Sequence, residues 1–474
     1  MDINLPVTKD QRCSESLDII EDRISKLPDE ILGKILSYLR TKRAVATSVL
    51  SKRWEYLWTL TSDLDFCDFG LLDDEAENKN DNDYMIKMRS FQRYVDRVIF
   101  YHGGSDIGKC RLDFHSKYAA PSFYALICAL ITCNVQKLSL DCCRSTSNTY
   151  SHLPWMFFSN NTLVELSISG NLVLDLPTYV CFPCLKILFI QFPVFVDDAS
   201  TARLFSSCPV LEELTIFRLK DDLEIMNISV PSLKRLMVDS GTSSCLQTTI
   251  NTPCLEYLEI DARSRYFVNF TSSLVHADVE GVDIYLLNAI SQVEYLSLTA
   301  SEMSLQNIIR DSALPIFKNL KTMELRDSVG WRTPANDWKV LPNLLDSSPN
   351  LRVLIFCQGL VSLTLYRDDF NHFDWQRPES VPECLSMHLK TIEIFEFVGF
   401  PEELQIVEYL LECGKVLEKM IIHRFVLSKS TIMKKKVKRD KVMSELLSLR
   451  RNCSTGEVMS FKRSSSSCEV IFTD

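Results

Sequence analysis

Apolar residues recur along most of this chain in one short pattern, at the first, fourth and sixth positions of a six-residue stretch. The middle position recurs from Leu138 to Met420 in eleven steps of 19 to 38 residues, with a mean of about 26. Each copy predicts one short strand whose anchors point inward. One copy cannot bury its anchors alone, so neighbouring copies are expected to stack into a parallel sheet over a continuous core. The middle anchors are Leu138, Leu166, Leu188, Leu214, Leu236, Leu258, Ala277, Leu296, Met323, Leu354, Ile392 and Met420.

Prolines punctuate this pattern by standing shortly before several of the predicted strands. Proline is tolerated at the entrance of a strand and ends the preceding helix or turn. The mean step also lies within the period of about 20–29 residues that is typical of leucine-rich repeats. A β-sandwich would need frequent hairpin turns, and few Asn-Gly or Asp-Gly signals occur. The prolines concerned are Pro183, Pro209, Pro231, Pro253 and Pro349.

The stretch from Asp22 to Thr59 has a helical pattern instead. Pro28 suits a first helical position, and the acidic residues after it suit the positive end of a helix dipole. Thr41 is a candidate cap of a second helix, and Ser51 of a third that carries Trp54. So small a unit buries little surface by itself, so we expect it to need a partner surface. Its apolar stripe comprises Ile31, Leu32, Ile35, Leu36 and Leu39.

These residues resemble an F-box, from Arg23-Ile24-Ser25-Lys26-Leu27-Pro28-Asp29-Glu30 to Ser51-Lys52-Arg53-Trp54. The resemblance implies docking on a Skp-type adaptor, which in turn binds a cullin. The expected adaptor contacts are Leu27, Pro28, Ile31, Leu32 and Val49. Trp54 and Trp58 are expected to close the helical core against the first repeat. The alternative is a helical hairpin that docks only on its own solenoid.

The C-terminal part is similar to the FBD module that follows leucine-rich repeats in a large plant family of F-box proteins. Val381-Pro382-Glu383-Cys384-Leu385 and Val416-Leu417-Glu418-Lys419-Met420 carry this resemblance. Between them, Pro401 should begin a helix and Gly414 should end it. The expected fold is therefore α/β: a helical F-box, an irregular solenoid with parallel strands on one face, and an FBD module.

The expected domain limits follow from these patterns. They are a disordered N-terminus over 1–21, the F-box over 22–60, a linker and solenoid entry over 61–134, repeats over 135–370, an FBD core over 371–427, and a basic helix and final strand over 428–474. Within the entry, we expect an acidic loop over 73–83 and a helix over 90–101.

Composition excludes several classes of protein. The net charge of −10 disfavours nucleic-acid binding, which needs concentrated Lys and Arg. The apolar run Phe123–Cys133 is shorter than the roughly 20 residues of a membrane span, so a buried helix is expected. Residues 1–21 lack a signal-peptide pattern, so the 17 cysteines are expected to be reduced thiols in an intracellular protein. The basic run Lys434–Arg439 is a candidate nuclear-import signal.

No constellation of catalytic residues stands out. Gly103–Cys110 has P-loop spacing, but Cys110 stands where Ser or Thr would bind magnesium, and a surface turn is the simpler interpretation. The seven histidines show no metal-ligand spacing. Acidic pairs such as Glu402-Glu403 are expected on solvated faces. We therefore expect no enzyme activity, cofactor or metal.

The combined resemblance implies the substrate-recognition subunit of an SCF-type cullin E3 ubiquitin ligase, in which the solenoid recruits an unknown protein target. The alternative is a repeat scaffold that binds proteins without delivering ubiquitin. A third interpretation, a nucleotide-dependent enzyme, rests only on the P-loop-like spacing. Target contacts are expected on the strand face, unless these side chains merely pack against loops or the C-terminal module. They are Phe189, Phe217, Arg235, Met237, Tyr257, Glu259, Tyr295 and Glu324.

Overall fold

The computed structural model describes most of the chain in segments. These are residues 23–67, 81–115, 120–143, 151–217, 223–239, 247–261, 265–269, 273–299, 308–309, 313–326, 340–360, 377–399, 401–424 and 463–473, apart from positions 25, 193, 282, 359 and 398.

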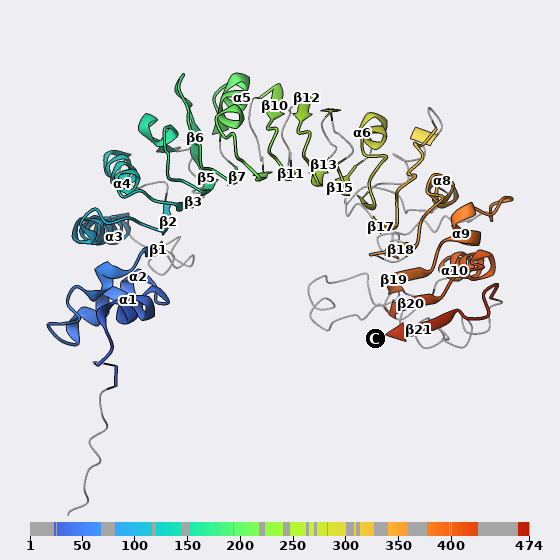
Figure 1. Ribbon diagram of the computed structural model, residues 1–474, viewed down its shortest axis with the longest axis horizontal. Helices are drawn as coiled ribbons and strands as arrows, with labels where there is room; N and C mark the ends of the chain where they lie inside the picture. The colour runs from blue at the N-terminus through green and yellow to red at the C-terminus, as the bar shows by residue number, and fades with distance from the viewer. Residues whose placement is uncertain are drawn as a thin grey trace, which may run out of the picture.

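Fifteen parallel strands form one sheet that lines the inner side of an arch (Figure 1). The predicted α/β solenoid with parallel strands on one face is thereby confirmed. The strands are β1 (Asp63–Cys67), β2 (Lys109–His115), β3 (Lys137–Cys143), β5 (Glu165–Gly170), β7 (Ile187–Gln191), β9 (Glu213–Phe217), β11 (Arg235–Asp239), β13 (Tyr257–Asp261), β15 (His276–Glu280), β16 (Tyr295–Thr299), β17 (Thr322–Arg326), β18 (Val353–Phe356), β19 (Thr391–Phe397), β20 (Lys419–Arg424) and β21 (Glu469–Thr473).

The register of this sheet aligns the predicted middle anchors. Leu138 pairs with Leu166, and the alignment continues strand by strand to Met420. Leu64 and Cys110 extend the row at one end, and Val470 extends it at the other. Anchors buried along a common row give the core its continuity, because each strand covers the apolar side chains of its neighbour.

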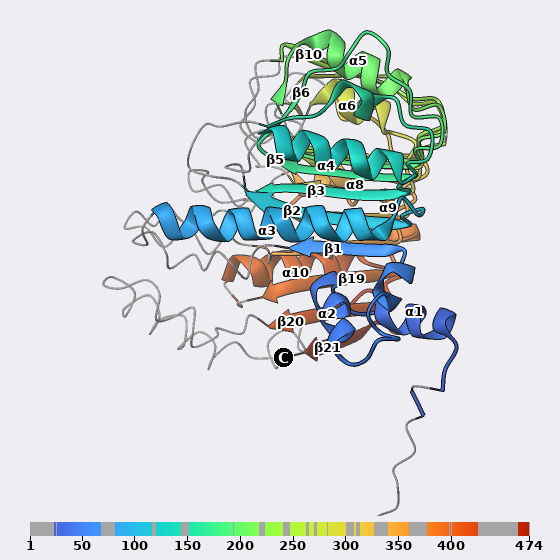
Figure 2. The same ribbon diagram turned by 90° about the vertical axis from the view of Figure 1, so that its left-hand side faces the viewer.

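Helices and short strands cover the outer side of the arch (Figure 1). Figure 2 shows α3 and α4 running alongside the first strands. The helices are α3 (Asp81–His102), α4 (Ala120–Thr132), α5 (Asp198–Ser206), α6 (Ile284–Ala289), α8 (Leu341–Asp346), α9 (Glu383–Met387) and α10 (Pro401–Cys413). Two small sheets, which the sequence analysis did not predict, join β4 (Ser151–His152), β6 (Leu172–Leu174) and β8 (Val194–Phe195), and β10 (Ile225–Ser229), β12 (Gln247–Asn251) and β14 (Arg265–Asn269).

Several local expectations can be compared with these elements. The buried helix expected around Phe123–Cys133 is α4, and α10 ends one residue before Gly414, as predicted. Helix α3 begins at Asp81, so positions 81–83 of the expected acidic loop are helical instead. The rest of that loop and the basic run Lys434–Arg439 lie outside the described residues. No helix among the described segments combines the length and apolar character needed to cross a membrane.

The P-loop-like stretch is a turn between a helix and a strand. Helix α3 ends at His102, two glycines with positive φ follow, and β2 begins at Lys109. A phosphate-binding loop needs the opposite order, with a helix after the loop. Cys110 is fully buried at the start of β2. The arrangement therefore contradicts nucleotide binding of the P-loop type.

Glu403 is a correction to the expectation of solvated acidic pairs. Its side chain is fully buried at the start of α10. Its carboxylate accepts the backbone N–H of Leu360 at 3.3 Å and that of Gly399 at 2.6 Å. A buried carboxylate is stable when backbone donors replace its water. Glu403 thus joins α10 to the segments that follow β18 and β19.

The N-terminal helical unit caps one end of the sheet (Figure 1). It comprises α1 (Asp29–Ser37), α2 (Thr41–Ala46), and the 3₁₀ turns η1 (Thr47–Val49) and η2 (Leu57–Leu60). No side chain caps α2, in contrast to the expectation for Thr41. Instead, the Thr41 hydroxyl accepts the backbone N–H of Asp65 in β1 at 2.7 Å. The unit is therefore bonded directly to the first strand of the solenoid.

Candidate functional site

Exposed apolar side chains gather on the N-terminal helical unit. Tyr38 is 90% exposed and Val49 is 87% exposed, although both belong to a segment of fewer than 40 residues. Contiguous exposed apolar surface is uncommon on monomeric proteins and marks interaction sites. We call this set the N-terminal apolar surface: Ile24, Ile31, Ile35, Tyr38, Leu39, Val49 and Leu50.

Helix α1 divides its apolar residues between two directions. Leu32 and Leu36, four residues apart, are buried, whereas Ile31 and Ile35 are each more than 40% exposed. Residues four apart share one face of a helix, so the inner pair and the outer pair face different surroundings. The buried side packs on Ala44, Trp54, Leu57 and Trp58, all of which belong to the core.

The predicted adaptor contacts fall into both groups. Pro28, Ile31 and Val49 are exposed, and Leu27 is half-buried against the core. Leu32 is a correction, because it is fully buried within the chain and has no surface to offer a partner. Sequence analysis also omitted Tyr38 and Leu50, which are more exposed than Ile31. A helical wheel could have indicated Ile35, but not the exposure of Leu50 beyond the end of η1.

An ion pair fixes the end of this unit against its beginning. The Arg53 guanidinium lies 2.6 Å from the Asp29 carboxylate and also donates to the Leu27 carbonyl. This contact spans 24 residues and holds the start of α1 beside the segment that carries Trp54. The N-terminal apolar surface is therefore held in place by buried aromatic packing on one side and by a charged contact at its edge.

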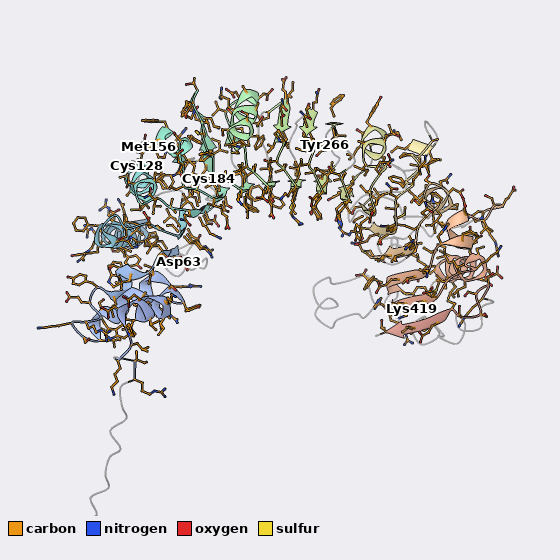
Figure 3. All side chains as sticks on the ribbon, in the orientation of Figure 1. Asp63, Cys128, Met156, Cys184, Tyr266 and Lys419 are labelled. Atoms are coloured by element: carbon orange, nitrogen blue, oxygen red, sulfur yellow. The ribbon has the colours of Figure 1, made fainter. Side chains whose placement is uncertain are left out.

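The predicted target contacts all lie on strand positions that face the concave side of the sheet. Figure 3 shows side chains projecting along this inner surface between Asp63 and Lys419. Arg235 is exposed and the other predicted residues are half-buried. The structure brings most of them together in two groups. Phe189 and Phe217 form one, with ring centroids 5.8 Å apart.

The second group is a column of stacked side chains across four adjacent strands. The Arg235 guanidinium lies 4.5 Å above the centre of the Tyr257 ring. The Tyr257 ring stacks on His276 at 4.6 Å, and His276 stacks on Tyr295 at 4.1 Å. We call these four residues the central stack. Sequence analysis missed His276, although its position beside the anchor Ala277 matches that of Tyr257 beside Leu258.

A polar network supports the central stack on the next row of the sheet. Tyr257 donates a hydrogen bond to Glu259 at 2.8 Å, and Tyr295 donates one to Glu324. Arg326 lies 2.8 Å from Glu324. These bonds hold the two phenol rings upright. Because Glu324 is paired with Arg326 and Glu259 accepts a phenol hydrogen bond, we interpret the network as a support for the stack.

The pKa shifts in this region agree with that interpretation. Burial, followed by the hydrogen bond to Glu259, raises the pKa of Tyr257 to about 12. Burial lowers the pKa of His276 from its ordinary value, so the imidazole in the stack is neutral at pH 7. Burial alone would raise the pKa of Glu324, but hydrogen bonds from Cys357, Tyr295 and Arg326 outweigh it and lower that pKa.

Charged residues alternate in sign along the rim where the strands begin. Lys186 lies 3.3 Å from Glu212, which also lies 2.9 Å from Lys234, and Lys321 lies 2.6 Å from Glu294. We call the residues that precede seven consecutive strands the rim ladder: Lys186, Glu212, Lys234, Glu256, Val275, Glu294 and Lys321.

A shallow hollow of about 360 Å³ adjoins both the rim ladder and the central stack. It is lined by Glu212, Glu213, Lys234, Arg235, Glu256, Tyr257, Val275 and His276. Among the described residues no cluster of His, Cys, Asp and Glu could hold a metal ion. The wall of the hollow thus combines charged side chains with the rings of Tyr257 and His276.

Comparison with known proteins identifies three matching regions. Residues 24–63 match the F-box domain, and residues 376–422 match the FBD family. Residues 124–356 match the leucine-rich repeats described for the FBD-associated F-box protein At5g56370. These regions include the N-terminal apolar surface, the central stack and α10.

The names of two relatives in Arabidopsis thaliana contain all three regions, F-box, FBD and leucine-rich repeat. The F-box/FBD/LRR-repeat protein At4g26340 is 32% identical over 80% of this chain and 86% of its own length. The F-box/FBD/LRR-repeat protein At4g00160 is 30% identical over 95% of this chain and 94% of its own length. The similarity thus extends over nearly the whole chain.

Proposed function

Because the chain belongs to the plant F-box/FBD/leucine-rich-repeat family, we propose that it is the substrate-recognition subunit of an SCF-type cullin E3 ubiquitin ligase. The F-box docks on a Skp-type adaptor, which connects it to a cullin. The concave face of the solenoid recruits a protein target. The chain contributes no catalytic group and acts by holding the target close to a charged ubiquitin-conjugating enzyme, which raises the effective concentration of its lysines.

The observation that carries this proposal is the N-terminal apolar surface. Its residues remain exposed although the same unit buries Leu32, Leu36 and Trp54 in its core. The solenoid therefore does not cover this surface within the part of the chain that the structure describes. A helical hairpin that docked only on its own repeats would be expected to bury these residues against the repeats. Adaptor contacts are assigned to Leu27, Pro28, Ile31 and Val49, with Ile35, Tyr38 and Leu50 added.

The target surface is assigned to the concave face around the central stack. Aromatic residues and Arg are enriched among the residues that dominate binding energy at interfaces. Arg235, Tyr257 and Tyr295 are of this kind. They lie within four successive strands of the sheet, preorganised by stacking and, for the two tyrosines, by hydrogen bonds to carboxylates. Preorganisation reduces the entropy lost when a partner binds.

Co-purification with a Skp-type adaptor and a cullin tests the first half of this function. We expect the wild-type chain to retain both proteins. The Ile31→Asp variant should retain at least about tenfold less adaptor, since a carboxylate would be desolvated in the interface. Ile225→Asp is the matched control, because Ile225 is similarly exposed, at 45% against 42%, but lies on the outer strand β10. A wild-type chain that retains no adaptor contradicts the proposal.

Turnover of bound proteins separates a ligase subunit from a binding scaffold. Proteins that co-purify with the wild-type chain should be ubiquitylated in a reconstituted reaction with the adaptor, cullin and ubiquitin-conjugating enzyme. The same proteins should remain bound but unmodified with Ile31→Asp. If the adaptor binds and no bound protein is modified, the chain is a scaffold.

A further inference from the structure

The rim ladder follows a simple rule across its strands. Backbone hydrogen bonds place each member beside the next: the Lys234 N–H donates to the Glu212 carbonyl at 2.9 Å, and the Glu256 N–H donates to the Lys234 carbonyl at 2.9 Å. Opposite charges on neighbouring strands attract, and like charges repel. From Lys186 to Glu256 every step changes sign.

The rule breaks at Val275. The Val275 N–H donates to the Glu256 carbonyl at 3.0 Å, and the Glu294 N–H donates to the Val275 carbonyl at 2.9 Å. Val275 is therefore flanked by a glutamate on each side, where a cation would continue the alternation of the four preceding members. Lys321, on the side of Glu294 away from Val275, forms an ion pair with Glu294. Glu256 has no ion pair within 4.0 Å to any residue in the segments the structure describes.

This break coincides with open space. Val275 is 47% exposed and lines the hollow of about 360 Å³, together with Glu256 and Tyr257. Three carboxylates line the hollow. That of Glu212 is paired with Lys186 and Lys234, whereas that of Glu256 is left without an ion pair among the described residues. An exposed valine between two acids can contact an apolar stem, and the acids can attract a cationic group at the end of that stem. A lysine or arginine side chain combines an apolar stem with a cationic end.

We propose that the concave face recognises an extended segment of its protein target through a lysine or arginine of that segment, which inserts at Val275 and completes the rim ladder. The stem of this side chain lies on Val275, and its cationic end lies between the carboxylates of Glu256 and Glu294. The neighbouring central stack supports the rest of the segment. This inference rests on the proposed function, because it specifies the chemistry of the target.

The test uses the full chain bound to its adaptor and a random peptide display library as the probe. Peptides selected by the wild-type chain should be enriched in Lys or Arg over the unselected library. For one such peptide, replacing its basic residue by uncharged norleucine should weaken binding about fivefold, the equivalent of one surface ion pair of about 1 kcal/mol.

Val275→Lys should mimic the bound state, because it supplies the missing cation from the chain itself. This variant should bind the selected peptide about fivefold more weakly than the wild-type chain does. It should bind the norleucine peptide with the same affinity as the wild-type chain. Val164→Lys is the matched control. Val164 holds the equivalent position before β5, but its neighbours in the row are Gln136 and Lys186 rather than two acids. The control should leave affinity unchanged.

Several outcomes overturn the inference: no enrichment of basic residues, or equal effects of Val275→Lys and Val164→Lys. Peptide binding that rises when Lys434–Arg439 is neutralised would assign the site to the chain's own basic run. A dimer that Val275→Lys dissociates would assign it to a second copy. Adaptor retention, measured on the same samples, reports the proposed ligase function separately.

Discussion

The imidazole of His276 and the phenol ring of Tyr295 stack almost face to face on adjacent strands, with centroids 4.1 Å apart and planes inclined by 9°. Tyr257 stacks on the other face of His276, and Arg235 covers the far side of Tyr257. The imidazole is thus enclosed between two rings, and burial lowers its pKa. Burial therefore favours the neutral imidazole of His276 in the folded state.

This enclosure predicts a stability that depends on pH. The folded pKa of His276 lies below its ordinary value of 6.5, so the unfolded chain binds a proton first as pH falls. Stability should therefore be complete above about pH 6.5 and decline below it, by at most about 1.4 kcal/mol per pH unit. Thermal unfolding at several pH values measures this slope. His276→Phe should reduce it.

Leu32 and Val49 should respond differently to truncation. Leu32→Ala opens a cavity in the core and should cost about 2–5 kcal/mol in the free energy of unfolding. Val49→Ala should change that free energy by less than about 0.5 kcal/mol, since Val49 is 87% exposed. Under the proposed function, Val49→Ala should nevertheless weaken adaptor binding. Denaturant unfolding with adaptor titration checks both, and equal losses of stability would contradict the division of α1 and η1 into inner and outer faces.

Gly170 at the end of β5 should not tolerate a side chain. Its φ is +89°, and a Cβ there would lie 1.7 Å from the carbonyl oxygen of Cys142 on the neighbouring strand. We expect Gly170→Ala to destabilise the fold by about 2–4 kcal/mol. Gly104→Ala separates the two causes, because Gly104 has a φ of +76° but no atom within 4 Å of its ideal Cβ. That variant should lose only about 1 kcal/mol.

The buried carboxylate of Glu403 should be essential for the C-terminal part of the arch. Glu403→Ala would leave the N–H groups of Leu360 and Gly399 without this acceptor, at a cost of about 2–4 kcal/mol. Glu418→Ala is a suitable comparison, because the Glu418–Lys390 ion pair is more than half exposed, and its loss should cost less than about 0.5 kcal/mol. Chemical denaturation of both variants measures the difference, and similar costs would contradict a structural role for Glu403.

The sequence predicted the repeating part of this fold because its signal is local. Anchors such as Leu188 and Leu214 lie in short strands with fixed spacing, and their burial follows from the spacing alone. The anchors Leu258, Ala277 and Leu296 already place His276 between Tyr257 and Tyr295. The spacing does not show, however, that these three rings stack face to face. The sequence also gave no indication that Glu403 would be buried, since its donors come from segments about 4 and 43 residues away.

The sequence did not predict that Ile31 would be exposed while Leu32 is buried. Both belong to one broad apolar stripe, and only the position of η2 and Trp54 decides which side is covered. The outer sheet of β4, β6 and β8 was missed because β4 and β8 are only two residues long. Strands of that length leave no periodicity to read.

The strand β1 joins the helical unit to the same hydrogen-bonded sheet as the repeats. Its first residue, Asp63, follows η2 by only three positions, and its register continues through β2 into β3. Under the proposed function, the adaptor-binding unit and the target-binding strands are therefore joined through one hydrogen-bonded sheet. Within residues 23–67, no flexible linker separates β1 from the helical unit. Which lysine of a target receives ubiquitin would then be a question of distance and angle, set by how many strands separate the bound segment from β1.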